Sequence, residues 1–141
     1  MPDPHGLQRF VDAQAPLIDD VLAELAAGRK RSHWMWFVFP QLRGLGSSAM
    51  ADHYGLGSLA EARAYAQHPL LGARLRRSVE LLLAVPGADA EAILGSVDAL
   101  KLHSCLTLFA LAAPGEPLYG RALARFFAGA QDAGTLRLLL L

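Results

Sequence analysis

The sequence predicts an all-α protein: one compact domain, residues 1–141, of about eight helices around a single buried helix. Apolar residues make up 53% of the 141 residues, and many are alanine and leucine, which favour helices. The apolar positions recur at helical spacing and are interrupted by proline and glycine, which end helices. The length is typical of one domain with its own core, and the chain contains no internal repeat or linker.

Two helices are expected at the N-terminal end. The first covers residues 7–13, and the second begins near Pro16, because proline is accepted in a first helical turn. An apolar stripe continues through Leu17, Val21, Leu22 and Leu25. Gly28 ends this helix.

The segment 33–39 is dense in aromatic residues. It could be a strand or a buried helix, because a run this short has no decisive periodicity, and Pro40 ends it. Ser32 is placed to cap a helix that starts here. A flexible loop rich in glycine and serine follows over residues 44–48.

The second half of the chain carries clearer helix signals. Ser58 and Glu61 form a capping box, and Asp89 can cap a short helix that ends at Gly95. Further helices are expected after His68-Pro69, over residues 118–127 and from Thr135 onward.

The segment 96–112 is apolar nearly all round, which predicts the central buried helix, with Leu100 among its buried residues. Asp98, Lys101 and Cys105 share a stripe about 60° wide on it. Lys101 either forms a structural ion pair with Asp98 or faces a solvent-filled cleft. Both are considered because the attraction within a buried ion pair rarely compensates for the loss of hydration of its two charges. Cys105 is interpreted as a small core residue.

Charge and cysteine content narrow the classes of partner and compartment. The 13 basic and 13 acidic residues balance at a pI near 7.0, which disfavours binding to duplex nucleic acid. A single cysteine allows no internal disulfide, so a reducing, cytoplasmic compartment is expected. The N-terminus lacks the order of a signal peptide, and no apolar run of about 18 residues would span a membrane. The histidines lack metal-ligand spacing, so neither a metal nor a cofactor is predicted.

The strongest functional clue is the run of Arg29, Lys30 and Arg31 followed by Ser32 and two tryptophans. Cations bind phosphate, and indoles stack on planar groups. The same residues could instead be structural, because basic residues favour helix C-termini and tryptophans fill cores. We expect this run, the 44–48 loop and the Asp98/Lys101 face to meet around one pocket. The predicted ligand-binding residues are Arg29, Lys30, Ser32, His33, Trp34, Trp36, Gln41, Gly44, Gly46, Ser47, Asp98 and Lys101.

Long stretches of this sequence resemble a bacterial family called domain of unknown function 1810. The resemblance rests on Arg9-Phe10-Val11, on Gln14 and above all on the run GRKRSHWMWFVFPQLRGLG from Gly28 to Gly46. It continues through His68-Pro69-Leu70-Leu71-Gly72 and from Lys101 to Phe109. The chain departs from the family pattern at Leu94 and at Cys105-Leu106. The resemblance implies a mostly helical fold.

A remote similarity to NADAR-type domains implies a ligand related to ADP-ribose. Those domains carry a glutamate in their aromatic motif, whereas this chain has no carboxylate between Glu24 and Asp52, so the catalytic acid of that motif is missing or moved and the similarity does not imply hydrolysis. The expected function is the binding or processing of a small nucleotide-like anionic ligand. The alternative is a non-enzymatic module that docks a protein through the Trp/Met/Phe segment 33–39.

Overall fold

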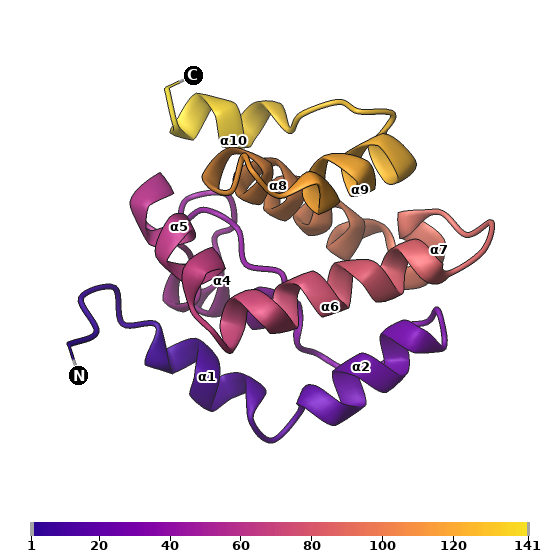
Figure 1. The fold of residues 1–141 in the computed structure, drawn as a ribbon, viewed down its shortest axis with the longest axis horizontal. Helices are drawn as coiled ribbons and strands as arrows, with labels where there is room; N and C mark the ends of the chain where they lie inside the picture. The colour runs from indigo at the N-terminus through magenta and orange to yellow at the C-terminus, as the bar shows by residue number, and fades with distance from the viewer. Residues whose placement is uncertain (1, 141) are drawn as a thin grey trace.

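The computed structural model describes residues 2–140, which form ten helices and no strand (Figure 1). The helices are α1 (Gln8–Gln14), α2 (Ile18–Ala26), α3 (Met35–Val38), α4 (Ala49–His53), α5 (Leu59–Gln67), α6 (Leu71–Ala84), α7 (Ala90–Leu94), α8 (Ser96–Ala112), α9 (Pro117–Phe127) and α10 (Ala133–Leu138). The all-α prediction is confirmed. The helix count exceeds the expected eight because α3 and α4 are single short turns of four and five residues.

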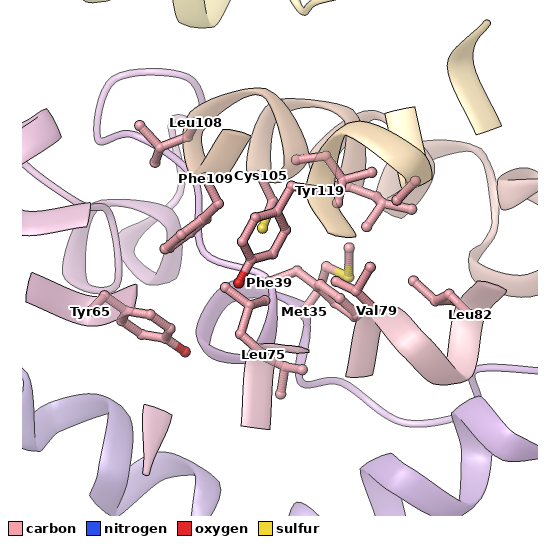
Figure 2. Close-up of a cluster of buried hydrophobic side chains, with 14 of the residues drawn as sticks. Met35, Phe39, Tyr65, Leu75, Val79, Leu82, Cys105, Leu108, Phe109 and Tyr119 are labelled. Atoms are coloured by element: carbon pink, nitrogen blue, oxygen red, sulfur yellow. The ribbon is translucent and has the colours of Figure 1, made fainter. Parts of the chain in front are cut away.

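Helix α8 lies at the centre of the fold. It packs against α5, α7, α9 and α10, while α6 contacts both α2 and α9 (Figure 1). Cys105, Leu108 and Phe109 are fully buried on α8 and lie among side chains from α3, α5, α6 and α9 (Figure 2). The prediction of a central helix over 96–112 is therefore confirmed.

The first turns of α8 are an exception to this burial. Val97 is 64% exposed and Leu100 is 69% exposed, so the prediction that Leu100 is buried is wrong. An apolar sequence requires burial only where another element covers the helix, and this face is left uncovered.

The aromatic segment 33–39 contains the short helix α3, which lies in the core. Its apolar side chains are at most 4% exposed except for Trp36, which is half-buried; the buried ones are Trp34, Met35, Phe37, Val38 and Phe39. A segment surrounded by protein on every side shows no amphipathic period, which explains why the sequence did not separate helix from strand.

A buried glutamine ties α3 to three other helices. Gln14 of α1 donates from Nε2 to the carbonyl oxygen of Phe37 at 2.6 Å and to the hydroxyl oxygen of Tyr65 at 3.0 Å. Its Oε1 accepts a hydrogen bond from Arg74 of α6 at 3.3 Å. Buried amides need such partners, so this set of bonds fixes how α1, α3, α5 and α6 pack together.

Ser58 and Asp89 cap the helices that follow them, as the sequence predicts. Ser58 Oγ accepts from the Glu61 N–H at 3.1 Å. The Glu61 carboxylate accepts from the N–H of Gly57, one residue before the N-cap, in place of the Ser58 N–H that a capping box uses. Asp89 Oδ1 accepts from the Ala92 N–H at 2.7 Å and caps α7.

Candidate functional site

The carboxylate of Asp98 is shared by the two lysines of the chain. Lys30 Nζ lies 2.9 Å from Asp98 Oδ2, and Lys101 Nζ lies 3.6 Å from Asp98 Oδ1. The structure thus brings residues 71 positions apart in the sequence (101 minus 30) to one point. One carboxylate can balance only one of the two ammonium groups, so the triad carries a net positive charge.

Lys30 is the more enclosed partner and has a structural role. Its Nζ donates to the Ser32 carbonyl at 2.6 Å and lies 5.0 Å from the centre of the Trp34 ring, and its side chain is 9% exposed. Its backbone N–H donates to the Ile93 carbonyl at 2.9 Å. Lys30 therefore joins the segment after α2 to the α7–α8 corner.

Glu24 is a carboxylate in this region that the sequence analysis did not single out. Its Oε1 accepts from the backbone N–H groups of Arg31 and Ser32 at 2.6 and 2.9 Å and from Trp34 Nε1 at 3.1 Å; its Oε2 accepts from Ser32 Oγ at 2.5 Å. Burial opposes ionisation, but the hydrogen bonds from Ser32, Arg31 and Trp34 outweigh it and lower the pKa of Glu24 to about 2. The clue to this role in the sequence is that Glu24 stands near the end of a helix, just before a run of residues rich in hydrogen-bond donors.

These bonds correct the interpretation of Ser32. It was expected to cap a helix, but α3 begins only at Met35, and Ser32 donates both its N–H and its hydroxyl to Glu24. The indole N–H of Trp34 is also engaged, and its ring is fully buried. Ser32 and Trp34 therefore have structural roles, because their hydrogen bonds to Glu24 hold the segment between α2 and α3 in place.

Lys101 faces a more open environment than Lys30. Its Nζ lies 4.9 Å from the centre of the Trp36 ring, and its side chain is 21% exposed. It lines a small cavity with Trp36, Gln41 and Tyr54. The volume of about 10 Å³ is enough for one water molecule.

Lys101 and Gln41 also line a larger groove, which we call the cationic groove. It runs along α8 beside the 41–46 loop and the start of α10, and has a volume of about 550 Å³. It is lined by Gln41, Leu45, Gly46, Val97, Leu100, Lys101, Ser104, Asp132, Ala133, Gly134 and Arg137. Ser104, Asp132 and Arg137 were absent from the sequence-based prediction, because α10 meets α8 only in the tertiary fold.

The acid in the cationic groove is already engaged by local hydrogen bonds. Asp132 Oδ2 accepts from Ser104 Oγ at 3.1 Å and from the N–H and hydroxyl of Thr135 at 3.0 and 2.7 Å. Burial opposes ionisation of Asp132, but the bonds from Thr135 and Ser104 outweigh it and hold its pKa below the ordinary value. These three hydrogen bonds stabilise the negative charge of Asp132. Arg137, in contrast, forms no ion pair with any residue from 2 to 140.

Gly46 is the predicted loop residue that reaches the cationic groove. A Cβ atom there would lie 2.7 Å from the Ala51 Cβ, so the absent side chain lets the loop rest against α4. Gly44 adopts φ 103° and turns the loop, while Ser47 is exposed. Neither of these two residues lines the groove.

The remaining predicted residues lie elsewhere on the surface. Arg29, Lys30 and Arg31 line a separate shallow hollow of about 510 Å³, which shares no lining residue with the cationic groove within residues 2–140. His33 is exposed and lines neither depression. The predicted residues are therefore divided among this hollow, the cationic groove and the small cavity beside Trp36, and the bridge from Lys30 to Asp98 to Lys101 links the hollow to the other two.

Metal-ligating groups and the single cysteine complete the description of the site. Among residues 2–140, no group of three or more His, Cys, Asp or Glu side chains is placed to hold a metal ion. Cys105 is fully buried, and burial raises the pKa of its thiol, so it serves the core as the sequence predicts.

The family model for DUF1810, described as a protein of unknown function, matches residues 4–139. The chain belongs to the DUF1810 family. Among solved structures, this DUF1810 protein is similar to the conserved hypothetical protein Rv1873 from Mycobacterium tuberculosis: the two are 52% identical, the match covers 99% of each chain, and the TM-score is 0.97. A comparison with curated proteins found no significant match. Within residues 2–140 of the DUF1810 protein, no helix is both long and apolar enough to cross a bilayer.

Proposed function

We propose that this DUF1810 protein binds a small nucleotide-like anionic ligand in the cationic groove. The observation that carries the proposal is the sharing of Asp98 by two lysines. Lys30 holds the closer oxygen at 2.9 Å, so the positive charge of Lys101 is only partly balanced at the groove wall. An anion placed there would meet this surplus charge without first displacing a tight ion pair.

The groove offers the mixed lining that such a ligand needs. Lys101 and Arg137 are suited to phosphate oxygens, since a lysine supplies a point charge and an arginine a planar fork. Leu45, Val97 and Leu100 supply apolar walls for a sugar or base. The volume of about 550 Å³ is within the usual range for small-molecule sites.

Gln41 and Lys101 line both the groove and the small cavity beside Trp36. A ligand in the groove would touch both side chains and could send a water-sized group, such as a hydroxyl, into the cavity. A sugar phosphate presents a hydroxyl near its phosphate, and the remote NADAR similarity also favours an ADP-ribose derivative, so ADP-ribose is the first compound to test.

The experiment is a thermal-shift titration with ADP-ribose, NAD, mononucleotides and sugar phosphates. A ligand that binds only the folded state stabilises it by about 2.7 kcal/mol at a hundredfold excess over Kd. We expect stabilisation by at least one of these probes, lost in Lys101→Met and weakened in Arg137→Gln. Arg31→Gln is the matched control, because Arg31 lines the other hollow and holds Glu24 only through its backbone N–H.

Two results would contradict the proposal. One is the absence of stabilisation by every probe at millimolar concentration. The other is a loss of binding in Arg31→Gln as large as in Lys101→Met, which would move the site to the hollow at residues 29–31. Docking of a protein through segment 33–39 is not favoured, because all its apolar side chains except Trp36 lie in the core.

A further inference from the structure

Two exposed aliphatic side chains form a ridge on the outer face of α8. Val97 and Leu100 are 64% and 69% exposed and lie three residues apart, which makes them neighbours on one helix face. Single exposed apolar residues are common, but adjacent large ones beside apolar-lined grooves are typical of contact surfaces. We call this pair the α8 ridge.

The two sides of the α8 ridge carry opposite charges. The cationic groove lies on one side, where Lys101 and Arg137 outnumber the single acid Asp132, whose carboxylate already accepts from Ser104 and Thr135. On the other side is a second groove of about 290 Å³, the acidic groove, which contains Asp89 and Glu91. Leu100 lines both grooves and therefore stands between them.

Exposed charged side chains lie on both sides of the α8 ridge; Asp89 also caps α7 through its Oδ1. Asp89, Glu91 and Arg137 are exposed, and none of them forms an ion pair with another residue of the range 2–140. The acidic groove also has an apolar wall, formed by Phe126 and Phe127 of α9. The face as a whole has an apolar centre between a positive and a negative side.

We propose that a second copy of this chain docks on this face and forms a twofold-symmetric dimer. In a twofold-symmetric contact, a surface that lies on one side of the symmetry axis faces the surface of the partner that lies on the other side of the axis in its own protomer. A ridge on the axis therefore meets its own copy, and the cationic groove of each protomer meets the acidic groove of the other. An apolar centre with charge-complementary edges is the composition of a specific protein interface.

This dimer goes beyond the proposed ligand and does not require it. An anion held by Lys101 and Arg137 would compete with the acidic groove of the partner for the same cations. The dimer is therefore tested on the full chain without any added nucleotide or phosphate, so that the two proposals can fail separately.

The first measurement is the mass of the full chain in solution across a range of concentrations, by light scattering or sedimentation. We expect a dimer, and we expect Leu100→Glu to raise its dissociation constant by roughly tenfold or more, because it places like charges together at the axis. Leu140→Glu is the matched control: Leu140 is 91% exposed, lines neither groove and should leave the dimer unchanged. Circular dichroism checks that each variant remains helical.

A charge exchange tests the pairing of the two grooves. Glu91→Arg and Arg137→Glu should each weaken the dimer, because each replaces one pair of opposite charges across the contact with a pair of like charges, and the double variant should restore it. A wild-type chain that stays monomeric at every concentration would overturn the proposal. So would a dimer that both Leu100→Glu and the single charge variants leave intact, or single-variant losses that the double variant does not recover.

Discussion

The indole Nε1 of Trp34 donates a hydrogen bond to Oε1 of Glu24 at 3.1 Å, from a ring that is fully buried. Glu24 lies in the last turns of α2, so this bond joins that helix to the core segment that leads into α3. A buried indole N–H needs an acceptor, and a carboxylate that also gathers two backbone N–H groups is a strong one. The packing of the aromatic segment thus depends on one acidic side chain.

Glu24→Gln is expected to destabilise the fold. An amide has one acceptor oxygen in place of two and no charge, so at least one of the four donors is left without a good partner. The expected loss is about 1–3 kcal/mol in the free energy of unfolding at neutral pH, measured by chemical denaturation. Glu80→Gln, at an exposed position with only a surface ion pair, should cost about 0.5 kcal/mol or less.

The stabilisation by Glu24 should depend on pH in a defined direction. The pKa of Glu24 is about 2 in the folded state, against an ordinary value near 4.5, so its contribution is fully present above pH 4.5 and is lost as the pH falls toward 2. The difference in stability between wild type and Glu24→Gln should therefore shrink over that interval. A difference that stays constant from pH 6 to about 2.5 would show that the charge of Glu24 is not what stabilises the fold.

Lys101→Met is expected to leave the melting temperature nearly unchanged. Asp98 keeps Lys30 as its closer partner, so the substitution strands no carboxylate, and the apolar stem can still pack on Trp36. The loss should be under about 1 kcal/mol, as for a partly exposed pair. A loss near 3–5 kcal/mol would show that Lys101, and not Lys30, is the structural partner.

Lys30→Met is expected to destabilise the fold far more than Lys101→Met does. Its side chain is the more buried of the two, and its removal breaks the 2.9 Å contact to Asp98 and the 2.6 Å bond to the Ser32 carbonyl. We expect a loss of about 3 kcal/mol, at the low end for a buried pair because Lys101 remains near Asp98. Thermal unfolding of both variants, side by side, measures the contrast; equal losses would contradict it.

Gly46→Ala is expected to displace the loop that walls the cationic groove. The new Cβ would lie 2.7 Å from the Ala51 Cβ, and neither atom belongs to a flexible side chain that could swing away. The expected cost is about 1–3 kcal/mol, as for overpacking in a core. Ala51→Gly in the same chain should recover part of that loss in a denaturant titration, and the absence of any recovery would contradict the assigned contact.

Local features of the sequence determined much of the secondary structure. Ser58 and Asp89 cap the helices that follow them because an N-cap bond spans only three residues, and Pro and Gly end helices through their own backbone restrictions. The largely apolar character of 96–112 likewise determined that α8 lies in the centre.

The site depended on contacts between distant parts of the chain, which local patterns do not contain. Ser32 looks like a helix cap in sequence, but Glu24 binds it from the preceding helix. Leu100 looks like a core residue, but no element covers its face of α8. The sequence left open whether Asp98 pairs with Lys101 one turn away or Lys101 faces a cleft. That Lys30 reaches the same carboxylate more closely was decided by the packing of the α2–α3 connection against the α7–α8 corner. Hydrogen bonds within a turn depend on neighbouring residues, whereas charge balance and exposure depend on which distant elements come together, and only the tertiary structure decides that.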